Sequence, residues 1–376
     1  MRISLVILAV ASSACFDMPP PPHATNGSDA AVGGGDAGPH DADPFRNDAA
    51  FGHVNIVFVS KATVEAGVLG SAAAGDTTCA NYAVAAGFPG KYVAWLADST
   101  RNAATALGSA RGWVRPDGLP VADTVADLAA GKIFYPIAID EAGSDHTGDQ
   151  NTLVATGANP TGSATANTCA NYTSPIGQIT CGLPQGTTTT WTNTLVTNCA
   201  DPTRLYCFEV DLDQEVDPPP APPDARIAFV SKNAFSVTGG LPAADLQCQT
   251  EATAASLPGT YVALLATSTA SAASRVTPAI YKRPDGVTIG PLTNAIITPI
   301  NVTAADGYVD VDVWTGAASI PAPFTSAGSA STTCGDWTNS TVNGTSASTV
   351  AGPSYFNGQL TVTCTSTDNH LYCAQQ

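Results

Sequence analysis

The stretches CANYAVAAGFPGKYVAWLA (79–97) and CQTEATAASLPGTYVALLA (248–266) decide how this chain folds. Each begins with a cysteine in an Ala-rich segment, which favours a helix, and continues into FPG or LPG, where glycine and proline end a helix. The β-branched and aromatic residues that follow predict a strand. Because the same pattern occurs twice, we infer that this part of the chain is repeated.

The repetition extends in both directions from these stretches. VNIVFVSK (54–61) returns as RIAFVSK (226–232), and RPDG occurs at 115–118 and again at 283–286. The cysteines correspond at a nearly constant offset: Cys79 with Cys248, Cys169 with Cys334, Cys199 with Cys364 and Cys207 with Cys373. Order and spacing together predict a duplicated domain.

The duplication predicts two tandem modules, residues 53–213 and 226–376, each within the usual size range of a domain. The strand and helix patterns favour the α+β class, with short mixed strands, one or two helices per module and long loops. Residues 214–225 are Pro-rich, so we expect an extended, semi-rigid linker between the modules.

Both copies of RPDG are expected to form tight turns. Proline sets φ for the second turn position, aspartate tolerates the third, and glycine accepts the left-handed conformation that closes the turn. A ligand-binding pair of arginine and aspartate is the alternative interpretation.

The N-terminal residues resemble an export signal. Residues 1–14 contain an apolar run that is too short to span a bilayer and is typical of a signal peptide. The small residues before Cys15 resemble a bacterial lipobox, so we expect Cys15 to be lipidated, with ordinary signal cleavage as the alternative. Residues 15–52, rich in Pro, Gly, Ala and Asp, are expected to be a disordered tether.

Charge excludes some partners. Only 12% of the 376 residues are charged, and the formal net charge is −17. Nucleic acid and anionic lipid headgroups both require clustered Lys and Arg, so we expect no nucleic-acid partner and membrane attachment only through the lipid.

The cysteines of an exported protein favour disulfides, and no CxxC pair indicates a zinc site. Spacing alone leaves the connectivity open, because four cysteines in a module permit three pairings.

The two modules resemble a known family. The Ala-rich helix with its cysteine, LPGTYVA (257–263), RPDG, VWTG (313–316), TCGDWT (333–338) and the final LYC (371–373) look like a family of bacterial exported domains of unassigned function. Those domains have a C-type lectin-like, endostatin-like fold. The resemblance covers both modules and implies that the outer two cysteines pair, as do the inner two. For this chain the implied disulfides are Cys79–Cys207, Cys169–Cys199, Cys248–Cys373 and Cys334–Cys364.

The first module departs from this pattern. It has LVATG (153–157) where the second has DVWTG (312–316), and TCANYT (168–173) where the second has TCGDWT. It also contains the unmatched Cys181. This cysteine is free, displaces a neighbour in the inner pair, or links to another chain.

Three common catalytic motifs, HExxH, GxSxG and the Walker-type loop, are absent from the sequence. We therefore expect no catalytic residue, no cofactor-binding residue and no cofactor. His146 is expected to be a solvated loop residue. Most of the tryptophans, at positions 95, 113, 191, 314 and 337, are expected to be packing residues.

Acidic residues form the strongest candidate site. They are Asp140, Glu141, Asp145 and Asp149 in the first module and Asp306, Asp310 and Asp312 in the second. The resemblance implies that both segments lie near the long-loop region where C-type lectins bind calcium and sugar. The sugar-binding signatures of those lectins are absent, so we expect solvated acids and no metal, with Ca²⁺ as the alternative.

Together these observations predict a membrane-anchored lipoprotein of the cell envelope, in the outer membrane and facing the periplasm or the cell surface. It would be non-enzymatic and would bind an envelope or extracellular protein or a glycan. A spacer without a ligand and an exported hydrolase are the alternatives.

Overall fold

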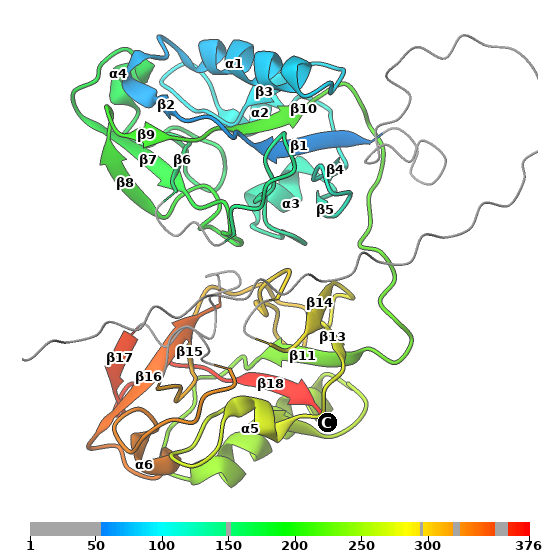
Figure 1. Cartoon of the computed structure of the whole chain (residues 1–376), viewed down its shortest axis with the longest axis vertical. Helices are drawn as coiled ribbons and strands as arrows, with labels where there is room; N and C mark the ends of the chain where they lie inside the picture. Colours follow the sequence, from blue (N-terminus) through cyan, green and yellow to red (C-terminus); the bar gives the residue numbers. More distant parts are fainter. Residues whose placement is uncertain (1–53, 148–151, 294–295, 319–323, 350–359) are drawn as a thin grey trace, which may run out of the picture. The chain divides into compact units, whose positions relative to one another are not determined.

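The computed structural model describes residues 54–147, 152–293, 296–318, 324–349 and 360–376 (Figure 1). These residues confirm the α+β class: short helices, several small sheets and four disulfides. The predicted signal peptide, Cys15 and the predicted tether lie outside the described residues. Among the described helices, none combines the length and the apolar character needed to cross a membrane.

A five-stranded sheet is the centre of the N-terminal half (residues 54–213). Its order is β3 (Tyr92–Ala94), β10 (Tyr206–Glu209), β1 (Asn55–Val59), β4 (Trp113–Val114) and β5 (Pro120–Ala122). The central strand β1 pairs antiparallel with β10 and parallel with β4. Its sequence NIVFV is almost entirely buried, as expected for a strand covered on both faces.

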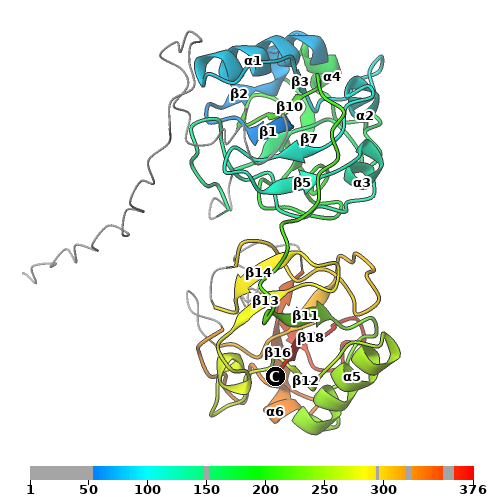
Figure 2. The same ribbon diagram turned by 90° about the vertical axis from the view of Figure 1, so that its right-hand side faces the viewer.

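The C-terminal half (residues 226–376) contains a second five-stranded sheet (Figure 2). Its order is β12 (Tyr261–Ala263), β18 (Tyr372–Gln375), β11 (Arg226–Val230), β13 (Ile280–Lys282) and β14 (Thr288–Pro291). Here too the first strand of the half is central, antiparallel to the last strand and parallel to β13. The two sheets therefore have corresponding strand orders.

Each half also has a three-stranded antiparallel sheet. In the N-terminal half it consists of β6 (Val154–Ala155), β7 (Gln178–Gly182) and β8 (Leu195–Asn198). In the C-terminal half it consists of β15 (Asp312–Trp314), β16 (Asn343–Ser348) and β17 (Leu360–Thr363). A two-stranded sheet, β2 (Val64–Glu65) with β9 (Pro202–Thr203), completes the N-terminal half.

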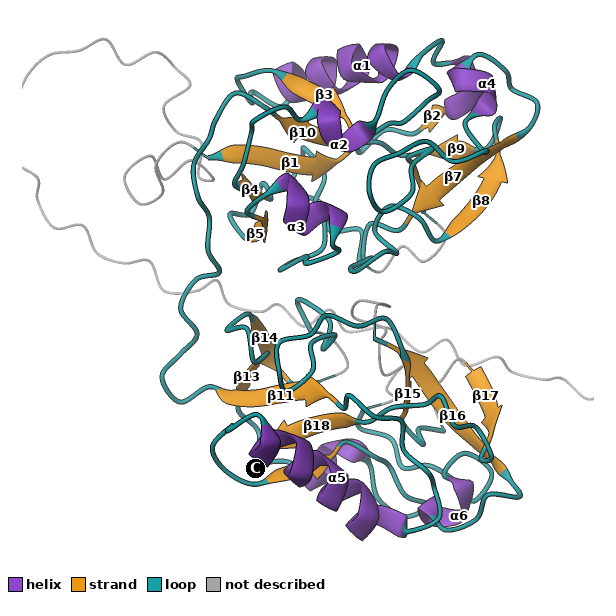
Figure 3. Cartoon of the chain, turned by 180° about the vertical axis from the view of Figure 1, so that it is seen from behind, coloured by secondary structure: helices purple, strands orange, loops and turns teal. Residues whose placement is uncertain are grey.

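Figure 3 shows the long helix of each half. As predicted, each of these helices carries the first cysteine of its half, Cys79 or Cys248. These helices are α1 (Ala72–Ala85), capped by the Ser71 side chain, and α5 (Gly240–Ala254). Small residues let α1 lie close to the sheet: a Cβ on Gly75 would lie 2.4 Å from Leu96 Cδ1. An ion pair fixes each helix, with Arg101 Nη1 2.7 Å from Asp76 Oδ2 and Arg275 Nη2 2.7 Å from Asp245 Oδ2.

The shorter helical segments lie in the loops: η1 (Ala66–Val68), α2 (Ala103–Ala106), α3 (Val125–Ala129) and η2 (Ala272–Arg275). Two more, α4 (Cys169–Tyr172) and α6 (Cys334–Trp337), are left-handed turns. Their four consecutive φ values are 53, 50, 58 and 65° in α4 and 52, 58, 54 and 66° in α6. Consecutive left-handed residues are costly for L-amino acids, so the surrounding contacts must hold both turns in place.

Two hydrophobic clusters fill each half, and all five tryptophans are fully buried in them, which confirms that they are packing residues. Contacts of the N-terminal half continue beyond residue 213. Val216 is 7% exposed, and its N–H donates to Asp123 Oδ1 at 3.0 Å. The carbonyl of Gln214 lies so close to Gly112 that a Cβ there would be 1.8 Å away. The start of the Pro-rich segment thus packs against the preceding half.

Candidate functional site

The first RPDG segment is a tight turn, as predicted. The N–H of Gly118 donates to the Arg115 carbonyl at 2.8 Å, and Gly118 has a φ of 83°. The Arg115 side chain, 5% exposed, donates through Nε to Asp117 Oδ1 at 2.9 Å and through Nη1 to the Pro136 carbonyl at 3.1 Å. The guanidinium is therefore occupied by partners within its own half.

The second RPDG segment holds an ion pair in which the arginine is fully buried and the aspartate is mostly buried. Arg283 Nη2 lies 2.7 Å from Asp285 Oδ2, and Nη1 donates to Asn301 Oδ1 at 2.8 Å. The Tyr308 hydroxyl donates to Asp285 Oδ2 at 2.6 Å. Burial favours the neutral carboxyl, but the Arg283 guanidinium and the Tyr308 hydroxyl hold the pKa of Asp285 below its ordinary value. Both RPDG arginines thus stabilise the turns that contain them, and neither is exposed as a ligand-binding group.

His146 and Asp140 were both predicted to be solvated side chains, and both predictions are wrong. Asp140 is 0% and His146 7% exposed, and Nε2 of His146 lies 3.0 Å from Asp140 Oδ2. The reason is a turn through Gly143, which brings the His146 N–H to the Ala138 carbonyl at 2.8 Å. The segment therefore folds back on itself and covers both side chains.

Asp140 is held as a carboxylate by this turn. Its Oδ1 accepts from the N–H groups of Ala142 at 2.9 Å and Ser144 at 2.8 Å. Burial works to raise the pKa of Asp140, but the hydrogen bonds from Ser144, His146 and Ala142 hold it below the ordinary value. The pair orients the imidazole and secures the loop.

The other acids of the N-terminal half do not converge on one point. Glu141 Oε2 accepts from the Lys61 N–H at 2.8 Å, whereas the exposed Asp145 accepts from the Thr147 N–H at 2.7 Å. Asp149 lies outside the described residues.

In the C-terminal half Asp306, Asp310 and Asp312 are exposed, as predicted. Asp306 lies in a turn with a φ of 60°, and Asp312 begins β15. Desolvation raises the pKa of Asp312 and of Asp310, and the charge of Asp312 adds to the shift of Asp310. In the part of the chain that the structure describes, no three His, Cys, Asp or Glu side chains are grouped so that they could hold a metal ion.

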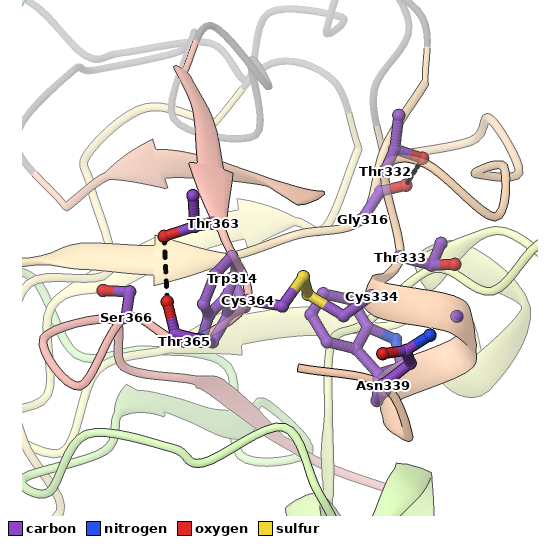
Figure 4. Close-up of a disulfide and its surroundings, with 12 residues drawn as sticks. Trp314, Gly316, Thr332, Thr333, Cys334, Asn339, Thr363, Cys364, Thr365 and Ser366 are labelled. Atoms are coloured by element: carbon purple, nitrogen blue, oxygen red, sulfur yellow. Dashed lines mark hydrogen bonds between the residues drawn. A yellow bond between two sulfur atoms is a disulfide. The ribbon is translucent and has the colours of Figure 1, made fainter. Parts of the chain in front are cut away.

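Two disulfides connect the elements of each half, and the four bonds together are the pairs that the resemblance implies. Cys79–Cys207 joins α1 to β10, and Cys248–Cys373 joins α5 to β18. Cys169–Cys199 and Cys334–Cys364 connect the left-handed turns to the ends of β8 and β17. Figure 4 shows the last of these beside Trp314, which belongs to the same buried cluster.

Cys181 is free and buried on β7. It lies opposite Leu195, four residues before Cys199, so it is too far along the strand to replace a partner in the inner disulfide. Burial raises the pKa of its thiol to about 12, which leaves it protonated and unreactive at neutral pH. The corresponding strand position of the C-terminal half is the buried Ser346.

A pocket of about 300 Å³ opens in the C-terminal half, between the end of α5 and the turn at residues 303–305. It is lined by Lys232, Asn233, Thr250, Glu251, Ala254, Ala255, Thr303, Ala304 and Ala305. Glu251 Oε2 accepts from the Lys232 N–H at 2.5 Å, and Oε1 accepts from the Asn233 N–H at 3.1 Å. The pocket therefore has alanine walls and one positioned carboxylate.

Sequence reasoning missed this pocket, although a signal was present. Glu251 and Tyr82 both lie three residues after the helix cysteine, and Ala304 and Glu141 both follow the first residue of the equivalent turns. The N-terminal half thus has two larger side chains where the C-terminal half has an opening. A position-by-position comparison of the two repeats would have identified Glu251 and Ala304 as positions where the halves differ.

Neither the protein-family models nor the curated proteins contain a match for this chain. The inference of a role therefore depends on the geometry described above.

Proposed function

We propose that this protein is an exported lipoprotein that presents two tandem C-type lectin-like modules, residues 53–213 and 226–376, as non-enzymatic binding units for a protein or glycan. Lipidation at Cys15 would anchor it, in the outer membrane, facing the periplasm or the cell surface. Corresponding strand orders and disulfides in the two halves support the tandem arrangement.

One observation carries the binding role: the framework is repeated whereas the surface around it differs. The RPDG turns, helix ion pairs and disulfides occur in both halves. The pocket at Glu251 corresponds to positions that Tyr82 and Glu141 occupy in the other half. A stable framework with variable surface positions is typical of domains that bind different ligands on one scaffold.

The test is a binding screen of the exported protein with a Cys15→Ser substitution, against envelope glycans and envelope proteins. We expect saturable binding to one class of ligand, retained in a sample that has no hydrolytic activity toward that ligand. Turnover of the bound glycan or protein, abolished by a single substitution, would instead favour the hydrolase.

A further inference from the structure

We propose that the pocket at Glu251 binds a phenolic ring, with the hydroxyl of the ring donating to the Glu251 carboxylate. This inference concerns one pocket and goes beyond the proposed binding role, which does not depend on it. It follows from the volume and walls of the pocket, from the hydrogen-bonding state of Glu251 and from a comparison with the N-terminal half.

The walls suit an aromatic ring. Four alanines, Ala254, Ala255, Ala304 and Ala305, provide the apolar part of the lining. The volume of about 300 Å³ lies at the lower end of the range for ligand pockets, and an apolar cavity of about half that volume accommodates benzene. The volume is therefore sufficient for a single substituted ring.

Glu251 retains capacity to accept a hydrogen bond. Its Oε1 accepts from the N–H and Nδ2 of Asn233, at 3.1 and 3.2 Å, and its Oε2 accepts from the Lys232 N–H at 2.5 Å. A carboxylate has about four acceptor positions, so Oε2 is able to accept one more donor. Because the backbone fixes this carboxylate at the pocket wall, a bound hydroxyl would gain a charge-assisted hydrogen bond.

The N-terminal half supplies the pair that is incomplete here. At the position of Glu251 it has Tyr82, which packs partly buried against the cluster around α1. At the position of Ala304 it has Glu141, which accepts from the Lys61 N–H at 2.8 Å. Burial raises the pKa of Tyr82, and the charge of the Glu141 carboxylate adds to this shift.

In the C-terminal half the carboxylate comes from the helix, and it accepts from the corresponding backbone N–H, that of Lys232. The phenol has no counterpart, because the turn position is Ala304. A ligand with a phenol group would supply the missing phenol. The carboxylate would then come from the helix and the phenol from the ligand, the reverse of the arrangement in the N-terminal half, where the phenol is on the helix. The chemistry is shared by a small phenol and by a tyrosine side chain on another protein.

The experiment titrates the protein with a Cys15→Ser substitution with matched probes by ligand-observed NMR. The probes are 4-methylphenol against toluene, and the capped peptide Gly-Tyr-Gly against Gly-Phe-Gly. We expect one saturable site per chain for the phenols and binding weaker by about tenfold or more for the probes without hydroxyl, the factor for losing a hydrogen bond to a charged group. Binding of 4-methylphenol alone would identify a small-molecule site, and tighter binding of the tyrosine peptide a protein-docking site.

Two variants make the result specific to this pocket. Glu251→Tyr with Ala304→Glu recreates the arrangement of the N-terminal half and should abolish binding while the circular dichroism spectrum is retained. Tyr82→Glu with Glu141→Ala makes the reverse change and should raise the stoichiometry from one site to two. Equal affinity for 4-methylphenol and toluene, or binding that persists in the filled variant, would overturn the phenol site and leave the proposed binding role standing.

Discussion

At the scale of the residue, the left-handed turns contain positions with an unfavourable backbone conformation, and specific contacts hold them in place. The Asn171 side chain accepts from the Ser99 N–H at 3.1 Å, and the Asp336 side chain accepts from the Ser268 N–H at 2.6 Å. Tyr172 and Trp337 each donate to a backbone carbonyl, at 2.9 and 2.8 Å. These contacts and the inner disulfides explain why residues other than glycine accept positive φ here.

Gly335 and Ala170 occupy the same position in the two turns and allow a reciprocal test. Gly335→Ala should lower the free energy of unfolding by about 1 kcal/mol, because alanine is strained at a φ of 58°. Ala170→Gly should raise it by a smaller amount, because glycine also gains entropy in the unfolded chain. Urea unfolding of both variants measures the changes, and Gly335→Asn serves as the control, since asparagine tolerates this region better than alanine.

The pair of Asp140 and His146 predicts acid sensitivity. Because the pKa of Asp140 in the folded protein is below its unfolded value, its contribution to stability is present above about pH 4 and is lost as the pH falls through the folded pKa. Asp140→Asn should therefore lower stability at neutral pH and reduce the dependence on pH below about 4. Unfolding curves measured from pH 7 to pH 2 test this, and parallel curves for the two proteins would contradict it.

At the scale of the element, the disulfides fix loops that short strands alone would not hold. The inner bonds each close a loop with a sequence separation of 30 residues. A loop of this length corresponds to about 3.7 kcal/mol of chain entropy, although strain and residual unfolded structure reduce such values.

Replacing Cys334 and Cys364 together by serine should lower the free energy of unfolding by about 2–4 kcal/mol. Cys181→Ser should lower the free energy of unfolding by less, because the C-terminal half has the buried Ser346 at the same place.

Non-reducing peptide mapping should give Cys248–Cys373 and Cys334–Cys364. A peptide that joins Cys248 to Cys334 would contradict the structure.

The acidic turns are not expected to bind calcium more tightly than millimolar. Asp140 is already occupied by Ala142, Ser144 and His146, and Asp145 accepts from Thr147. The measurement is a calorimetric Ca²⁺ titration after chelation, at moderate salt to suppress diffuse attraction. A micromolar site lost on Asp145→Ala with Asp149→Ala would revive the calcium-dependent alternative.

Local patterns predicted some of these elements and failed for others, for identifiable reasons. The helix around Cys79 and the strand after FPG follow from local composition and from the glycine and proline that end the helix, signals that act over a few residues. The burial of His146 depends on a turn that returns the chain to Ala138, which no local pattern records. The left-handed turn through Ala170 and Tyr172 lacks the glycines that would signal it. The pocket at Glu251 and Ala304 is indicated only by a comparison of the two repeats, which the pattern of one segment does not contain.

At the scale of the whole molecule, the two halves fill the same core position with different pairs of side chains. The N-terminal half has Ala155 and Ile179 where the C-terminal half has Trp314 and Gly344. A Cβ on Gly344 would lie 2.9 Å from the Trp314 ring, so the small residue makes room for the large one. LVATG and DVWTG therefore each pack well against the residues of their own half.

Anchoring is a property of the whole chain and is tested by fractionation. If Cys15 is lipidated, the wild type should sediment with membranes, and Cys15→Ser should move the protein to the soluble fraction because the substitution removes the thiol that carries the lipid. Mass spectrometry of the N-terminal peptide is the direct check. A soluble wild type with an unmodified Cys15 would contradict the anchor.

The pairing of the first strand with the last has a consequence for mechanical load. Since β1 is antiparallel to β10, a force on the two ends of the N-terminal half peels these strands apart from one end, one hydrogen bond at a time. The bond from Cys79 to Cys207 then stops the extension, because the 128 residues it spans cannot lengthen between the two sulfur atoms. The bond from Cys248 to Cys373 limits the C-terminal half in the same way. Under tension, each half would extend only through the residues that lie outside this disulfide.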